Sequence, residues 1–166
     1  MGRLKTTDLM AFDLVRHKKT KEVISVFEID EYRNVINNEA DGYCSETNIG
    51  IDDVEPIPLT QSILEDNGFV LQDSWYRWRK YDNEIAIKFP YTDSYYQYVE
   101  ICYTKLCYNP EDVTETEYGM NFVFKNTVNV HELQHVLRLC GLNDLADNLK
   151  LEDDEPIEVE LKLEKT

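Results

Sequence analysis

The stretch VNVHELQHVLRLCG, residues 128–141, decides the fold prediction because it carries the clearest helical pattern in the chain. Its apolar side chains recur with the period of a helix and form one stripe: Val130, Leu133, Val136, Leu137 and Cys140, with Leu139 near its edge. Gly141 follows, and glycine readily takes the left-handed conformation that closes a helix. The pattern therefore predicts one main helix over about residues 128–140 that packs its stripe on a core.

Within this helix, residues 131–135 spell the H-E-x-x-H pattern of zinc hydrolases. Histidines at this spacing lie on one helix face and can share a Zn²⁺ ion, while the glutamate activates the metal-bound water. A hydrolase hypothesis therefore assigns His131 and His135 as metal ligands and Glu132 as the catalytic base. The hypothesis lacks a third ligand, because no histidine follows His135 and no later acid stands in a distinctive pattern.

The helical wheel places His131 and His135 almost opposite the apolar stripe, beside Gln134 and Arg138. We therefore expect these histidines to face a cleft or solvent and not to belong to the core. The fixed positive charge of Arg138, on the same side of the helix, opposes a bound metal ion. The prediction is that the protein has no catalytic residue, no metal site and no cofactor.

On both sides of the main helix, alternating or β-branched apolar residues predict strands. The predicted strands cover residues 8–30 (a hairpin), 75–81 and 84–90 (a second hairpin), 96–103, 120–125 and 157–163. Thr60 and Gly68 are typical first and last positions of a short helix. A second short helix is predicted at residues 143–150.

These elements predict an α+β fold. We expect residues 1–55 to form a small barrel-like β unit. Residues 56–166 are expected to form an antiparallel sheet packed with the main helix and the short helices. No linker rich in glycine or serine separates the two parts, so we expect them to share one compact core.

The chain is strongly acidic, because its 166 residues carry 17 Lys and Arg against 33 Asp and Glu, a formal net charge of -16. Residues 26–73 have a net charge of -11 and residues 111–160 a net charge of -10. Nucleic-acid binding relies on cations that neutralise phosphates, so we expect no direct nucleic-acid binding. An acidic surface serves solubility or meets a protein with a basic surface, and such a protein is the partner that we expect.

Neither a membrane span nor a signal peptide is predicted, because no apolar run approaches the ~20 residues that a span needs. The four cysteines form no metal-binding pair and are expected to be free thiols: Cys44, Cys102, Cys107 and Cys140. We therefore expect a location in the reducing cytoplasm of a host cell, or in a virion.

Two aromatic clusters provide further alternatives. One combines aromatic and cationic side chains: Trp75, Tyr76, Arg77, Trp78, Arg79, Lys80 and Tyr81. Such a cluster either stacks on single-stranded nucleic acid or packs across a hairpin with exposed cations, and we favour packing. The other cluster holds four tyrosines that would line the pocket of a small-ligand sequestering protein: Tyr91, Tyr95, Tyr96 and Tyr98.

Three segments form a longer pattern: Asp8-Leu9 with Asp13 and Val15, PIPLTQSILEDNGF at 56–69, and VHELQHVLRLCGL at 130–142. This pattern resembles a family of uncharacterised proteins encoded by gut anaerobes and by the phages and mobile elements that infect them. The resemblance spans most of the chain and implies a phage or mobile-element accessory protein, without attaching an activity to it. The family pattern leaves the position of Glu132 open, which implies that the H-E-x-x-H spelling is incidental in this chain.

The leading hypothesis is therefore a non-enzymatic accessory protein that binds another macromolecule. Its sharpest version is an inhibitor whose carboxylates imitate a nucleic-acid backbone in the basic groove of a host defence or nucleic-acid-processing protein. A virion or assembly component is a second version. The alternatives are a zinc-dependent hydrolase that uses His131, Glu132 and His135, and a small-ligand sequestering protein.

Overall fold

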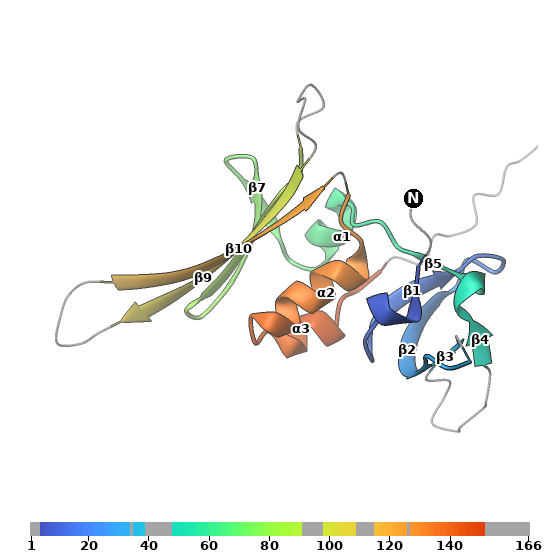
Figure 1. Ribbon diagram of the computed structural model, residues 1–166. Helices are drawn as coiled ribbons and strands as arrows, with labels where there is room; N and C mark the ends of the chain where they lie inside the picture. Colours follow the sequence, from blue (N-terminus) through green and yellow to red (C-terminus); the bar gives the residue numbers. More distant parts are fainter. Residues whose placement is uncertain are drawn as a thin grey trace, which may run out of the picture.

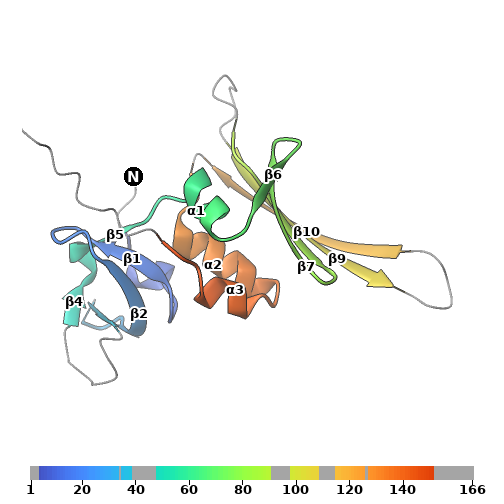
Figure 2. The ribbon, with the colours of Figure 1, turned by 180° about the vertical axis from the view of Figure 1, so that it is seen from behind.

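The computed structural model describes residues 4–33, 35–38, 48–90, 98–108, 115–125 and 127–151. These residues form two five-stranded antiparallel sheets and a few helices, so the predicted α+β class is confirmed. The main helix lies between the two sheets, as both ribbon views show (Figures 1 and 2). This position gives each side of the helix a sheet to face.

The first sheet has the strand order β4-β3-β2-β1-β5. Its strands are β1 (Leu14–His17), β2 (Val23–Asp30), β3 (Val35–Asn38), β4 (Asn48–Gly50) and β5 (Val54–Pro56). β1 and β2 form the hairpin that the sequence predicts within residues 8–30. The barrel-like closure is not found: in the described residues the edge strands β4 and β5 each pair with one neighbour, whereas a barrel needs its edges to pair with each other.

The second sheet is a meander in the order β10-β9-β8-β7-β6. Its strands are β6 (Val70–Gln72), β7 (Trp75–Lys80), β8 (Asn83–Lys88), β9 (Tyr98–Tyr108) and β10 (Glu115–Lys125). The predicted hairpin over residues 75–90 is confirmed by the pairing of β7 with β8. β9 and β10 pair with each other over 11 residues, from Tyr98↔Lys125 to Tyr108↔Glu115, which is longer than the apolar pattern indicates.

Three α-helices and two 3₁₀-helices complete the described fold: α1 (Gln61–Asp66), α2 (Val130–Leu139), α3 (Asn143–Asp147), η1 (Thr6–Asp8) and η2 (Ile51–Asp53). α1 begins as predicted, because the Thr60 side chain accepts a hydrogen bond from the backbone N–H of Ile63. α1 and α2 are each followed by a left-handed glycine, Gly68 at φ +80° and Gly141 at φ +75°. The end of α2 therefore lies where Gly141 predicts it.

Two separate apolar cores hold these layers. The core under the second sheet joins α2 and α3 to the inner side chains of the strands, among them Tyr76, Ile85, Ile87, Val99, Ile101, Leu133 and Leu137. The core of the first sheet is smaller and consists of Leu4, Leu9, Val15, Ile24, Val26, Ile36, Ile51 and Val54. The predicted strand at 157–163 lies outside the described residues. Within the described residues, no helix is long and apolar enough to cross a membrane.

Candidate functional site

The polar side of α2 lines a groove and is not open to solvent, so of the two expected environments the structure shows the cleft. Gln134 is fully buried, and His131 is only 4 % exposed. The cause is the first sheet, which lies beside α2 (Figure 1) and whose Leu14 backbone N–H bonds to Gln134. A helical wheel cannot anticipate a second sheet on the polar side, so it does not predict how deeply His131 and Gln134 are buried.

Gln134 connects three parts of the molecule through its side-chain amide. Its Oε1 accepts a hydrogen bond from the backbone N–H of Leu14 at 2.8 Å. Its Nε2 donates to the carbonyl of Phe12 at 3.0 Å and to the carbonyl of Ala146 at 2.9 Å. Because buried backbone groups need partners, this one side chain satisfies groups at the start of β1 and in α3.

Phe12 has a strained backbone at this contact. Its φ is +67°, which is unusual for a bulky residue. The conformation is held from two sides, because the Phe12 N–H donates to the carbonyl of Val26 and its own carbonyl accepts from Gln134. The chain is thus bent sharply where the first sheet meets the helix.

Asp13 is the second buried polar group of this interface, and it is 0 % exposed. One oxygen, Oδ2, lies 2.7 Å from Nε2 of His135 and accepts a hydrogen bond from the backbone N–H of Met10. The other oxygen, Oδ1, accepts from the Arg138 guanidinium at 2.6 Å, and Arg138 also contacts Asp147. A buried carboxylate is stable only when paired and hydrogen-bonded, and these residues provide both.

Glu132, the catalytic base of the hydrolase hypothesis, forms the capping box of its own helix. Its Oε2 accepts hydrogen bonds from the backbone N–H of Asn129 at 2.7 Å and from the Asn129 side chain at 2.9 Å. This arrangement satisfies N–H groups that the helix start leaves without partners. The carboxylate is thereby oriented towards the helix start.

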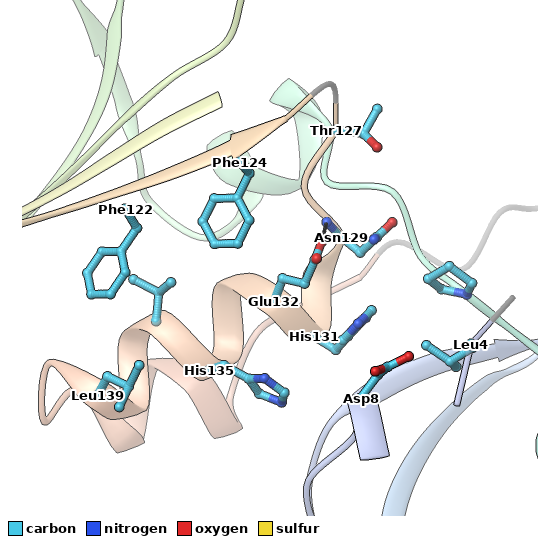
Figure 3. Close-up of a pocket in the computed structure, with 12 residues that line it drawn as sticks. Leu4, Asp8, Phe122, Phe124, Thr127, Asn129, His131, Glu132, His135 and Leu139 are labelled. Atoms are coloured by element: carbon cyan, nitrogen blue, oxygen red, sulfur yellow. Dashed lines mark hydrogen bonds between the residues drawn. The ribbon is translucent and has the colours of Figure 1, made fainter. Parts of the chain in front are cut away.

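His131, Glu132 and His135 nevertheless line one groove, which lies beside α2, β10 and η1 and has a volume of about 600 Å³. The rings of His131 and His135 meet edge to face, with centroids 6.0 Å apart. Figure 3 shows Phe122 and Phe124 of β10 above them. The other lining residues are Leu4, Asp8, Pro56, Thr127, Asn129, Val136 and Leu139.

Among the described groove residues, His131 alone has a buried hydrogen-bonding atom without a partner. Its Nδ1 is buried and has no partner among the described residues. Burial lowers the pKa of His131 below its ordinary value, an effect that outweighs the opposing charges of Glu132, Asp13 and Asp8. The imidazole is therefore neutral at pH 7.

The site offers too few ligands for a metal ion within the part of the chain that the structure describes. No group of three or more His, Cys, Asp or Glu side chains lies close enough there to hold one. His135 uses Nε2 for Asp13, so its remaining ring nitrogen is the one left for a ligand. That the protein contains no zinc stays a prediction.

The aromatic cluster of β7 packs across the hairpin, as the favoured interpretation predicts. Lys88 lies 5.4 Å from the ring centre of Trp75, and Arg77 and Arg79 both pair with Glu84. Burial acts to raise the pKa of Glu84, but Arg79 and then Arg77 outweigh it and lower the pKa below its usual value. Of the tyrosine cluster, only Tyr98 lies in the described residues, where it is 39 % exposed.

Two of the four cysteines have described side chains, and both are free thiols, as predicted. Cys140 is buried and Cys102 is half-buried. Burial raises the pKa of the Cys140 thiol to about 11, so it stays protonated and unreactive at neutral pH. The side chains of Cys44 and Cys107 lie outside the described part of the structure.

Comparison of the chain with protein-family models, with curated proteins and with solved structures gave no match.

Proposed function

We propose that this protein is a non-enzymatic binding protein whose acidic surface engages a basic surface of another macromolecule. The observation that carries the proposal is the pairing of its cations. Six described Lys and Arg side chains already form ion pairs with acids of the same chain: Lys21, Arg33, Arg77, Arg79, Lys105 and Arg138. These six cations are neutralised within the chain, and the 33 Asp and Glu outnumber all 17 Lys and Arg, so a large excess of acids remains.

Several of the surplus acids are exposed and form no ion pair among the described residues. Glu31, Asp66 and Asp73 are of this kind, and they lie at turns and at the end of α1. With a formal net charge of -16, such a surface attracts a basic partner and raises the rate of encounter. A nucleic-acid-mimicking inhibitor, acting in the host cytoplasm for a phage or mobile element, is the sharpest form of this proposal.

The hydrogen bonds that the H-E-x-x-H side chains form favour a binding role over hydrolysis. Glu132 caps α2, and His135 binds Asp13. A hydrolase would have to release Glu132 from Asn129 and recruit a third ligand. The site therefore supports a zinc-dependent hydrolase less well than it supports a binding protein.

The proposal is tested by association kinetics with a nona-arginine peptide over a salt series, with a nona-citrulline peptide as the neutral control. The triple variant Glu31→Lys, Asp66→Lys and Asp73→Lys is expected to associate several-fold more slowly. The matched control exchanges the ends of one ion pair, Lys21→Glu with Glu55→Lys, which keeps the net charge and should keep the rate. Rates that ignore both salt and charge reversal would show that the acids serve solubility alone.

A further inference from the structure

We infer that the groove beside α2 receives an arginine side chain of the basic partner. The inference rests on the proposed function and adds the place where that partner is anchored. It starts from the chemistry of the groove, which combines carboxylates, a neutral imidazole and aromatic rings.

The charges that line the groove are negative. Asp8 comes from η1 and Glu132 from α2, and no Lys or Arg lies among the described lining residues. Each carboxylate uses one oxygen for the backbone, since Oδ2 of Asp8 accepts from Lys5 and Oε2 of Glu132 accepts from Asn129. The other oxygen of each remains for a ligand, and a cationic donor complements both.

The apolar part of the groove fits the rest of an arginine side chain. The half-buried rings of Phe122 and Phe124 stand over α2, and Leu139 is 71 % exposed at the rim (Figure 3). A planar guanidinium stacks on aromatic faces, and its methylene stem covers apolar surface. The volume of about 600 Å³ lies within the range of ligand sites.

His131 adds an observation that is independent of charge. Its side chain lines the groove, is 4 % exposed, and leaves Nδ1 without a partner in the described residues. A buried polar atom without a partner calls for an explanation such as a bound group. A neutral imidazole can accept a hydrogen bond at Nδ1 and does not repel a cation, so a guanidinium N–H supplies the missing donor.

Other ligands fit less well. An anion would meet the carboxylates of Asp8 and Glu132, and a metal ion lacks a third side-chain ligand in the described residues. A free amine carries the same kind of charge as an arginine side chain. The experiment therefore has to distinguish a free amine from an arginine side chain as the ligand of the groove.

The probe is N-acetylarginine methylamide. Its binding is monitored through the amide chemical shifts of the isotope-labelled protein. We expect saturable shifts at the ends of the groove, in residues 4–9 and 127–136. N-acetylcitrulline methylamide has the same shape without the charge, and it should cause no saturable shift. n-Butylamine, a singly charged free amine without a guanidinium, tests the free-amine source, and tenfold tighter binding of n-butylamine than of the blocked arginine would overturn the assignment to a partner's arginine side chain.

Asp8→Asn with Glu132→Gln removes the two charges and keeps the acceptors that cap η1 and α2. We expect the dissociation constant of the probe to rise about tenfold. The matched control, Glu31→Gln with Asp73→Asn, removes two charges elsewhere and should change it less than twofold. Equal effects of both variants, or shifts spread over the whole acidic surface, would overturn the groove as the anchor.

The two proposals fail in distinguishable ways. If nona-arginine binds with salt dependence but the blocked arginine gives no shifts in the groove, the acidic surface binds without this anchor. If nona-arginine itself does not bind, the proposed function fails first.

Discussion

The second sheet and the contact between the first sheet and α2 are built on different principles. The second sheet is a meander, so its neighbouring strands are close in the sequence. The contact with the first sheet joins residues far apart: Leu14 bonds Gln134 across 120 positions, and Asp13 meets His135 across 122. The second sheet is stabilised by apolar packing between strands that are close in the sequence. The contact of the first sheet with α2 depends on a few buried polar groups that must all pair with one another.

This difference locates the sensitive part of the molecule. Removing one partner from a buried polar network leaves the others unpaired, whereas an exposed pair contributes little. Substitutions in the polar contact should therefore cost much more stability than substitutions on the open surface of the second sheet.

Asp13→Ala should have the largest effect. The change leaves the Arg138 guanidinium, whose side chain is 14 % exposed, without its buried counterion and removes the acceptor of His135. We expect a loss of about 3–5 kcal/mol in the free energy of unfolding, measured by urea denaturation. Asp147→Ala is the control, because Asp147 is 41 % exposed and its loss leaves the buried pair intact. Equal losses in the two variants would contradict the buried network.

Gln134→Leu should come next. The volume is nearly kept, but the N–H of Leu14 and the carbonyls of Phe12 and Ala146 lose their partner. We expect a loss of about 2–3 kcal/mol in the free energy of unfolding, together with faster hydrogen exchange at the Leu14 amide. Gln61→Ala, at an exposed position of α1, should change the stability by less than about 0.5 kcal/mol. An unchanged exchange rate at Leu14 would show that this hydrogen bond is not made in solution.

The second sheet and the long-range contact also differ in how far the sequence predicts them. The β7–β8 hairpin and α2 are predicted correctly, because alternation, helical periodicity and Gly141 are local signals. The full length of β9 and β10 is not predicted, because the ladder continues through polar residues such as Glu115–Glu117 that carry no apolar alternation.

The site was predicted in part. The sequence selects His131, Glu132 and His135, and the structure does bring them to one groove. The sequence cannot show that the Asp13 carboxylate contacts the His135 ring or that the Gln134 side chain hydrogen-bonds to the Phe12 carbonyl. No local pattern links positions more than a hundred residues apart. Nor does the sequence indicate that Asp8, Phe122 and Phe124 complete the groove.

A third prediction concerns pH and His131. Burial lowers the pKa of His131 below its ordinary value of 6.5, so the unfolded chain binds a proton more readily than the folded one. Stability should therefore fall as the pH drops below about 6.5, until the folded-state pKa is also passed. Urea denaturation between pH 7.5 and 5 of the native chain and of His131→Gln measures this slope. A slope that is the same in both proteins would mean that His131 is not buried in its neutral form.

The smallest effect is expected at Tyr81, in the turn between β7 and β8. Tyr81 is 87 % exposed and has a φ of +54°, a conformation that asparagine tolerates better than tyrosine does. Tyr81→Asn should therefore raise the free energy of unfolding slightly, by about 0.5 kcal/mol, since strain at such positions costs on the order of 1 kcal/mol. Part of the gain is lost with the contact to Lys80, which lies 5.9 Å from the Tyr81 ring centre. Lys80→Ala measures that contact alone. A loss above 1 kcal/mol in Tyr81→Asn would show that this turn, like Phe12, is held by contacts beyond its own hairpin, and the contrast between the two regions would then be smaller than the hydrogen bonds indicate.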